Sequence, residues 1–263
     1  MTRAAVICAV AVVAVNAQSS FRTDAPSAES AVSYLLLDAA HGKVLAIRWR
    51  SAEVAVPVGS LVKPFLAITY GQTHRMRFPI HDCTGEDCWL MTGHGRIGMA
   101  SAIAYSCNSY FCELAQDVAP ADVAEVADRF GLRGPPRNCD RDTLFGMGSA
   151  WRMAPVEVAR AYAELAARRT EPGIAKVIEG MRLSASIGTA AAVGPMLRGV
   201  SALAKTGTAP CSHSPKAAAD GYVVVVYPAD SPRYVLLVQA HGEVGRQAAE
   251  SAARLLRAGV GVR

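Results

Sequence analysis

Lysine and aromatic residues are scarce in this chain of 263 residues. Aromatic side chains make up 6% of it, and no stretch interleaves them with basic residues, so the sequence does not favour nucleic-acid binding. The net charge of +5 is spread without a long basic run, a balance that suits an anionic cell wall or membrane surface. The shortage of lysine is more informative about function than the net charge, because only five of the 27 basic residues are lysines. They are Lys43, Lys63, Lys176, Lys205 and Lys216.

A hydrophobic run long enough to cross a bilayer is also missing. The apolar stretch from Ala4 to Val15 is well short of the roughly 20 residues that a spanning helix needs. It follows Arg3 and ends in Val15-Asn16-Ala17, the small-x-small pattern after which signal peptidase cuts. The pattern predicts an export signal over residues 1–17, with a short uncleaved anchor as the alternative. A polar linker is expected over residues 18–30, and one domain over residues 31–258.

Export would place the cysteines in an oxidising compartment, where disulfides persist. Without Cys8, which lies in the predicted signal, six cysteines remain. Cys83 and Cys88 flank a Thr-Gly-Glu-Asp turn and are the best candidates for a local disulfide. His81, Cys83, Cys88 and His94 could instead hold zinc, although their spacing is not that of a standard zinc knuckle. Free thiols are the third possibility, and the other pairings cannot be deduced from the sequence.

Three short strings carry the residues of one kind of chemistry: Ser60-Leu-Val-Lys63, Ser106-Cys-Asn108 and Lys205-Thr-Gly-Thr208. Two of the five lysines lie in these strings. Arginine cannot give up its proton, so a site that needs a neutral amine must keep lysine. An unactivated serine hydroxyl is a poor nucleophile, and Lys63, one helical turn from Ser60, is placed to be its base. The strings therefore predict a serine acyl-transfer site.

The apolar pattern predicts a sheet, a helical block, more sheet and a last helix, in that order. Strands are expected over residues 32–37, 43–49, 202–209, 222–227 and 234–239. Helices are expected over residues 60–70, 97–105, 110–118, 123–130, 155–168, 174–183 and 244–256. Gly71 should end the first helix, and Pro64 is harmless in its first turn. The predicted fold class is α+β: a five-stranded antiparallel sheet flanked by helices, with an inserted all-helical lobe.

At this point the chain resembles the transpeptidase domain of class B penicillin-binding proteins, within the penicillin-recognising, β-lactamase-like superfamily. The likeness covers residues 31–258 and extends past the three strings. Further similar segments are Tyr34–Ala46, Val58–Phe65, His94–Ile97, Gly146–Gly148, Met153–Ala159, Gly180–Arg182 and Gly188–Ala190. One departure is that Ser106 and Lys205 are only 99 positions apart, which leaves less material for the acceptor side of a cleft.

The resemblance implies roles for the first two strings. Lys63 would take the proton of Ser60, which then attacks the carbonyl of a D-alanyl-D-alanine end. Ser106 would relay a proton to the leaving amine. Asn108 would bind the peptide and orient Lys63. The simpler interpretation of Ser106 and Asn108 is that they cap the helix that starts near Tyr110.

The third string has implied roles as well. Lys205, Thr206 and Thr208 would receive the carboxylate of the substrate. Gly207 would let that substrate lie flat along the strand, where any side chain would obstruct it. The backbone amides of Ser60 and Thr208 would form the oxyanion hole. The resemblance implies no cofactor and no catalytic metal.

The predicted function is an exported serine D,D-transpeptidase or D,D-carboxypeptidase, in the periplasm or on the outer face of the cytoplasmic membrane. Its expected partners are peptidoglycan stem peptides, β-lactam antibiotics and membrane-bound cell-wall synthesis proteins, without nucleic acid. The alternatives are a serine β-lactamase and a penicillin-sensing or scaffold domain. No recognised motif places a carboxylate to activate water, so slow deacylation is expected. The histidines outside any motif are expected at the surface: His41, His74, His213 and His241.

Overall fold

The computed structural model describes residues 32–211, 217 and 219–260. The predicted export signal and linker, and His213, lie outside these residues. No helix among the described residues is long and apolar enough to cross a membrane.

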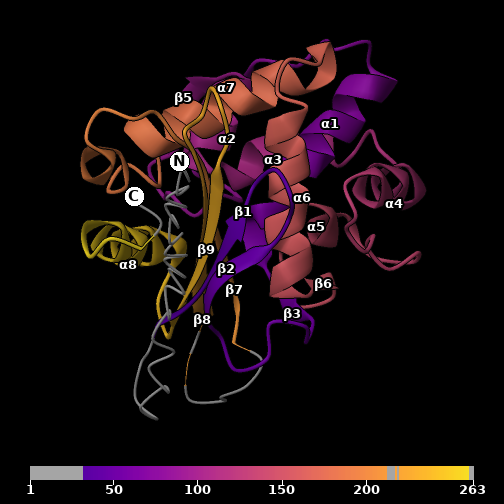
Figure 1. The fold of residues 1–263 in the computed structure, drawn as a ribbon. Coiled ribbons are helices and arrows are strands. Elements are labelled where there is room, and N and C mark those ends of the chain that lie inside the picture. Colours follow the sequence, from indigo (N-terminus) through magenta and orange to yellow (C-terminus); the bar gives the residue numbers. More distant parts are fainter. Residues whose placement is uncertain (1–31, 212–216, 218, 261–263) are drawn as a thin grey trace, which may run out of the picture.

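A five-stranded antiparallel sheet forms the centre of the molecule (Figure 1). The predicted early hairpin and the three predicted late strands make up this sheet, in the order β2-β1-β9-β8-β7. The strands are β1 (Val32–Asp38), β2 (Val44–Arg48), β7 (Leu203–Pro210), β8 (Ala219–Tyr227) and β9 (Tyr234–His241). Strand β7 is an edge strand, hydrogen-bonded to β8 alone within the sheet.

Alternating apolar side chains give the sheet two buried faces, because successive residues of a strand point to opposite sides. Val224 and Leu237 pack in the larger core, toward the helical lobe, whereas Val223 and Val238 pack in the smaller one. The smaller core is covered by α8 (Gly245–Arg257) and by the 3-10 helix η2 (Gly194–Leu197). Figure 1 shows α8 on one side of the sheet and α6 on the other. These layers confirm the predicted α+β fold class.

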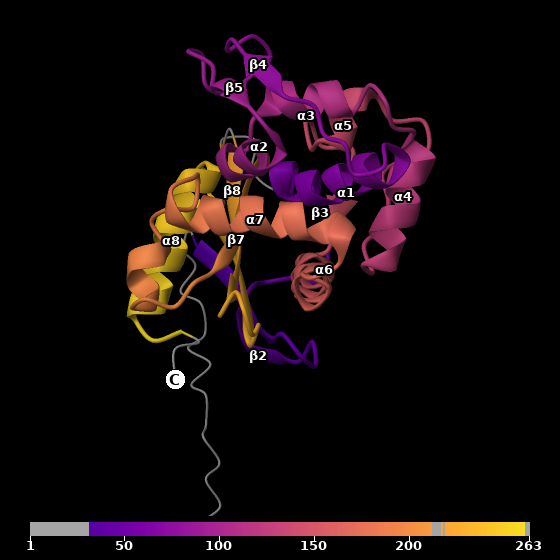
Figure 2. The same ribbon diagram turned by 90° about the horizontal axis from the view of Figure 1, so that it is seen from above.

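The helical lobe is built from the chain between β2 and β7, and Figure 2 shows α7 running across it. Its longer helices are α1 (Lys63–Thr73), α4 (Pro120–Arg129), α6 (Pro155–Ala167) and α7 (Pro172–Ser186). Its shorter helices are α2 (Met99–Tyr105), α3 (Asn108–Leu114) and α5 (Arg141–Leu144). Proline stands in the first turn of each of the four longer helices, where its missing N–H costs no intrahelical hydrogen bond.

The helix predicted to start at Ser60 differs in two ways. It begins as the 3-10 helix η1 (Gly59–Val62) and becomes α-helical at Lys63. It also passes through Gly71, which was expected to end it. A Cβ at position 71 would lie 2.9 Å from both Met76 Sδ and Phe78 Cζ, so glycine is required there by close packing rather than by helix termination.

Two small sheets were not predicted. Strand β3 (Val56–Pro57) pairs with β6 (Arg152–Met153), and β4 (His81–Cys83) pairs with β5 (Gly95–Ile97). The second pair forms an arm that projects from the lobe (Figure 2). Since Ile97 pairs with His81, α2 starts at Met99 instead of at the predicted residue 97.

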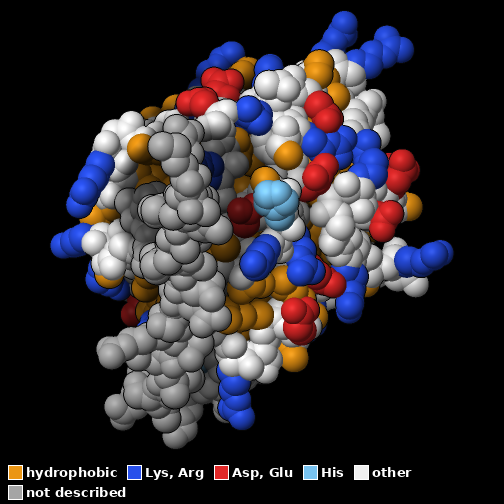
Figure 3. Space-filling view, in the orientation of Figure 1, with side chains coloured by type: hydrophobic (Ala, Val, Ile, Leu, Met, Phe, Trp, Pro, Cys, Tyr) orange, Lys and Arg blue, Asp and Glu red, His pale blue; other side chains and the backbone are white. Residues whose placement is uncertain are grey.

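Basic and acidic side chains are interspersed over the helical lobe on the face drawn in Figure 3. This distribution agrees with a net charge of +5 that is spread along the chain.

Candidate active site

Lys63 lies at the junction of η1 and α1 and is fully buried. Its Nζ donates hydrogen bonds to the carbonyl oxygen of Ser106 at 2.9 Å and to Asn108 Oδ1 at 2.6 Å. The rings of Phe111 and Phe145 lie 5.2 and 5.9 Å from the same nitrogen. Burial lowers the pKa of Lys63 to about 7, although nearby thiols act in the opposite direction. A large fraction of this amine is therefore neutral at physiological pH.

Ser106 occupies a left-handed turn, with φ of 54°, at the C-terminal end of α2. Its hydroxyl accepts a hydrogen bond from Lys205 Nζ at 2.8 Å, and that nitrogen also donates to the carbonyl oxygen of Thr206 at 2.7 Å. The helix cap is supplied by neither Ser106 nor Asn108. Cys107 caps α3, because its Sγ accepts from the backbone N–H of Tyr110. The side chains of Ser106 and Asn108 are thus left for the two lysines.

Lys205 is the second buried lysine, and it comes from the edge strand β7. Burial, and then the charge of Lys63, lowers its pKa well below the usual value. Ser106 lies between the two amines, since its carbonyl oxygen binds Lys63 and its hydroxyl binds Lys205. Residues from all three sequence strings therefore meet in one hydrogen-bonded group.

Ser60 lies in η1, half-buried, where the edge strand β7 passes close to the backbone. A Cβ on Gly207 would overlap the carbonyl oxygen of Val58, and a Cβ on Gly59 would overlap the backbone of Thr208. Gly59 also has φ of +57°, a conformation that favours glycine. The buried Tyr162 of α6 fixes η1 from behind by donating to the carbonyl oxygen of Leu61 at 2.7 Å. The backbones of Gly59 and Thr208 are thereby held close together.

The hydroxyls of Thr206 and Thr208 have partners within the fold. Thr206 Oγ1 lies 2.6 Å from Thr189 Oγ1, and Thr208 Oγ1 accepts from the backbone N–H of Gly245 at 2.9 Å. Because the hydroxyl of Thr208 is only an acceptor in that contact, its own proton can still be donated. The expected carboxylate-binding role of the two threonines stays a prediction.

A second cluster lies directly beside these residues. Cys83, on β4, Cys88 and His94, in the loop between β4 and β5, and Cys107 place four possible ligand atoms within 4.8 Å of one another. Both Cys83 Sγ and Cys88 Sγ lie 3.5 Å from His94 Nδ1, and Cys88 Sγ lies 3.8 Å from Cys107 Sγ. The Cys83–Cys88 disulfide, the best disulfide candidate in the sequence, is not formed, since neither thiol belongs to a disulfide.

These three distances match those around a tetrahedral zinc ion. Zn–S bonds of about 2.3 Å and Zn–N bonds of about 2.0 Å put two sulfurs about 3.8 Å apart and a sulfur and a nitrogen about 3.5 Å apart. A disulfide would need sulfurs about 2.0 Å apart. The residues present therefore fit a Cys₃His metal centre, a set of ligands used by structural zinc sites.

Two histidine expectations need correction. His81, one of the four ligands suggested by the sequence, is not part of the cluster. Its Nδ1 lies 2.5 Å from Glu113 Oε2 and its Nε2 lies 2.7 Å from Ser109 Oγ. His241, expected at the surface, lies partly buried at the end of β9, with Nδ1 2.8 Å from the buried carboxylate of Asp220.

The sequence analysis missed Cys107 as a possible ligand because it was assigned to the serine–asparagine string alone. The available signal was chemical: a cysteine in that string, in a chain with two cysteines and a histidine shortly before it. Phe111 and Phe145, whose rings lie near Lys63, were missed because nothing in their local sequence distinguishes them from ordinary core residues.

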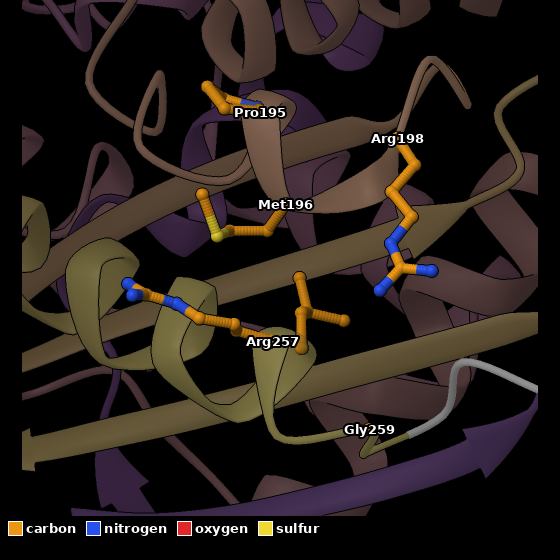
Figure 4. A pocket seen from close by; sticks show the side chains of 6 residues that line it. Pro195, Met196, Arg198, Arg257 and Gly259 are labelled. Carbon is orange, nitrogen blue, oxygen red and sulfur yellow. The ribbon is translucent and has the colours of Figure 1, made fainter.

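A surface hollow lies away from all of these residues, between η2 and α8 (Figure 4). It is lined by Pro195, Met196, Arg198, Leu256, Arg257 and Gly259. None of the residues singled out from the sequence contributes to it.

In this fold a helix with serine and lysine one turn apart faces a strand with the lysine–threonine–glycine sequence. A model of the penicillin binding protein transpeptidase domain matches residues 11–258, and the chain belongs to that family. None of the curated proteins compared with the chain matches it.

Several solved structures share the fold. PBP2 from Pseudomonas aeruginosa, in complex with WCK 5153, has a TM-score of 0.72 and 17% identity, over 86% of this chain and 72% of that one. The apo transpeptidase domain of penicillin-binding protein 3 from Burkholderia pseudomallei has a TM-score of 0.67 and 18% identity, over 87% of this chain and 88% of that one. PBP2 from Helicobacter pylori, in complex with MreC, has a TM-score of 0.70 and 16% identity, over 87% of this chain and 60% of that one. At such low identities these structures support the fold alone.

Proposed function

We propose that the chain is an exported serine D,D-transpeptidase or D,D-carboxypeptidase that acts through an acyl-Ser60 intermediate. Membership of the family implies acyltransferase chemistry on peptidoglycan and penicillin binding. The observation that supports the finer proposal is the buried Lys63, with a pKa lowered to about 7, one turn from Ser60 in the helix η1 that packs against β7.

Acylation begins with the hydroxyl of Ser60. A neutral lysine amine has two N–H donors and one lone pair, and the two donors of Lys63 are used by Ser106 and Asn108. The lone pair is left to take the proton of Ser60 as its Oγ attacks the carbonyl carbon of the terminal D-alanyl-D-alanine bond. The backbone N–H groups of Ser60 and Thr208 stabilise the oxyanion that forms, each worth about 3 kcal/mol.

The leaving group then needs a proton. As the tetrahedral intermediate collapses, the C–N bond breaks and D-alanine departs as an amine. Ser106 Oγ gives the amine its own proton and takes one from Lys205 Nζ, which donates to it at 2.8 Å, while Lys63 keeps the proton of Ser60. The charge on Lys205, with Thr208, attracts the carboxylate of the departing residue.

The acyl-enzyme has two fates. An acceptor amine attacks the ester to give a cross-link and restores the Ser60 hydroxyl, whereas water gives a trimmed peptide. With a β-lactam as the acyl donor, slow attack by water leaves the protein inhibited.

The test is the reaction of the purified chain with a fluorescent penicillin and with a D-alanyl-D-alanine peptide. We expect a stable label on wild type, no label on Ser60→Ala, and release of D-alanine by wild type only. Rapid loss of the label would support the β-lactamase alternative. Peptide binding without any label would support the scaffold alternative and overturn the proposal.

Residues 31–258 are proposed to form the working domain, with the segment before it directing export to the periplasm or the outer membrane face. The mass of the protein recovered from cells tests this, because cleavage after Ala17 shortens the chain at a defined position. PBP2 from H. pylori forms a complex with MreC, and by analogy with that protein a membrane-bound cell-wall synthesis protein is proposed as a partner of this chain.

We also propose that Cys83, Cys88, His94 and Cys107 bind one structural zinc ion. Three thiolates and an imidazole would be supplied by the β4–β5 arm and by the residue between Ser106 and Asn108. The ion would take no part in the chemistry. It would fix the turn that presents Ser106 and Asn108 to the lysines.

Metal analysis of single variants tests the zinc centre. We expect Cys88→Ser to contain one zinc ion fewer per chain than wild type. Cys112→Ser is the matched control, because Cys112 lies on α3 outside the cluster, and its zinc content should be unchanged. Equal zinc content in the two variants would contradict the proposal.

A further inference from the structure

A second group of possible metal ligands lies at one end of the main sheet. Asp220 of β8 pairs directly with His241 of β9 and with Ala209 of β7. Cys211 follows Ala209 by two residues, and residues two apart on an extended chain point to the same side. Side chains of three neighbouring strands therefore converge on one face: a thiol, a carboxylate and an imidazole.

The distances around His241 are short. Its Nδ1 lies 2.8 Å from Asp220 Oδ1 and 3.8 Å from Cys211 Sγ, and the three atoms all lie within 4.8 Å of one another. A cation bound between the three atoms would lie within reach of all of them. His94 is placed similarly, because two possible ligand atoms, the sulfurs of Cys83 and Cys88, lie 3.5 Å from its Nδ1.

The surroundings of the carboxylate also suit a metal ligand. Asp220 is only 2% exposed, and burial of a carboxylate is costly unless its oxygens are paired. Its second oxygen, Oδ2, accepts from Gln239 Nε2 at 3.0 Å, and Gln239 in turn donates to Tyr222 at 3.2 Å. Hydrogen bonds of this kind orient the carboxylates that ligate metals.

We propose that Cys211, Asp220 and His241 bind a second divalent cation of the zinc class. Sulfur, nitrogen and oxygen donors together favour a borderline ion such as Zn²⁺ over Mg²⁺ or Ca²⁺, which prefer oxygen alone. Zinc bonds of about 2.0 to 2.3 Å put neighbouring ligand atoms roughly 3.3 to 3.6 Å apart, which lies between the 2.8 Å and 3.8 Å that separate His241 Nδ1 from Asp220 Oδ1 and from Cys211 Sγ.

The place of this site in the fold indicates its role. Cys211 is three residues beyond Thr208, roughly 10 Å along the strand at about 3.3 Å per residue. Strand β7 is an edge strand, paired on one side only. A cation between Cys211 and the other two residues ties the end of β7 to β8 and β9. The ion therefore holds in place the strand that carries Lys205 and Gly207.

Metal counting by native mass spectrometry of the full chain, supplied with Zn²⁺, tests this inference. We expect two zinc ions on wild type, one on Cys211→Ser, one on Cys88→Ser and none on the double variant. Cys139→Ser is the control that should keep two. If only the Cys83, Cys88, His94 and Cys107 cluster binds no zinc, wild type would carry one ion and Cys211→Ser none. The experiment therefore distinguishes failure of one metal proposal from failure of the other. Neither outcome depends on acylation of Ser60.

A second readout covers the case in which Cys211→Ser does not fold. His241→Gln keeps a polar side chain at the position, and Co²⁺ bound to Cys211 in wild type should give a thiolate-to-cobalt absorption band. In the Cys88→Ser variant the first metal site is removed, so any such band comes from Cys211. We expect Cys88→Ser to show the band and the double variant Cys88→Ser/His241→Gln to lack it. A Cys88→Ser protein with neither bound zinc nor the band would show that Asp220 and His241 form an ordinary ion pair, and would overturn the inference.

Discussion

The chemistry of this molecule depends on how two buried lysines share one serine. Lys63 and Lys205 bind the carbonyl oxygen and the hydroxyl of Ser106, and both are fully buried. Two ammonium groups at such close quarters would repel each other, and burial penalises each charge. One of the pair must therefore be neutral for much of the time. Burial lowers the pKa of both amines, and Lys63, one helical turn from Ser60, is the one placed to serve as base.

The first prediction concerns the pH dependence of acylation. Only the neutral form of Lys63 can take the proton of Ser60, so the second-order rate of penicillin acylation should rise with pH and level off above about 7. Stopped-flow measurement of label formation at a series of pH values tests this. A rate that is flat from pH 5 to about pH 9 would exclude Lys63 as the base.

The second prediction is that Lys63→Arg acylates roughly 100-fold or more slowly than wild type, because a guanidinium cannot act as a general base. Lys176→Arg is the matched control: Lys176 lies on α7, near the ring of Phe78, outside the lysine pair. The same labelling assay compares them. Comparable loss in both variants would point to a general effect on folding.

The third prediction links the pKa of Lys63 to stability. Between about 7 and the ordinary value of 10.5 the unfolded chain binds a proton on Lys63 more often than the folded chain. The free energy of unfolding should therefore rise with pH in that interval. Urea unfolding between about pH 7 and pH 8.5, below the ordinary range of tyrosine, should show a smaller rise for Lys63→Met than for wild type. Parallel pH curves for the two proteins would contradict the lowered pKa.

At the scale of elements, the site is built around a contact between η1 and the edge strand β7. Glycines at positions 59 and 207 allow this contact, because a side chain at either would overlap the opposite backbone. Each of the three catalytic strings is a short local sequence, so the sequence alone could identify it. That the strings come together in one site depends on this packing, which the sequence indicates only through the two glycines.

The fourth prediction is that Gly207→Ala separates β7 from η1. We expect acylation at least tenfold slower and a free energy of unfolding lower by roughly 1–3 kcal/mol, as for other overpacked sites. Gly98→Ala is the control, because a Cβ there meets only the flexible end of Ile80 at 3.2 Å. Penicillin labelling measures the acylation rate of both variants, and urea unfolding measures their free energy of unfolding. Equal behaviour would mean that the contact is looser than the structure indicates.

Helices and strands whose apolar residues repeat at a regular spacing could be predicted from the sequence, whereas the short strands could not. The central strands and the longer helices follow the apolar pattern closely, as for α6 (Pro155–Ala167) against the predicted 155–168. Strands β4 and β5 have three residues each, and their sequence shows no alternation. They form because the arm packs on α2 and α3 near Cys107. That contact is tertiary, so a local pattern could not reveal it.

At the scale of the whole molecule, both metal-ligand clusters join segments that are far apart in the sequence. One connects the β4–β5 arm to Cys107 in the turn before α3, and the other connects the ends of β7, β8 and β9. The sequence suggested three of the four residues in the first cluster, because Cys83, Cys88 and His94 are near one another in the chain. The second cluster depends on strand register, which becomes known only with the fold.

The fifth prediction is that a chelator lowers the thermal unfolding midpoint of the wild-type protein. A site filled at a hundred times its dissociation constant stabilises the fold by about 2.7 kcal/mol, or roughly 5–10 °C for a chain of this size. Differential scanning calorimetry with and without chelator measures the shift. The double variant Cys88→Ser/Cys211→Ser should show no such shift. Wild-type protein that is indifferent to chelation would argue against metal-supported folding.

The central claim is that Ser60 carries the acyl group, and intact-protein mass spectrometry after penicillin treatment tests it most directly. Wild type should gain the mass of one penicillin, localised by peptide mapping to the segment that contains Ser60, and Ser60→Ala should gain nothing. An adduct that persists in Ser60→Ala, or wild type that remains unmodified while still binding the drug, would contradict the account.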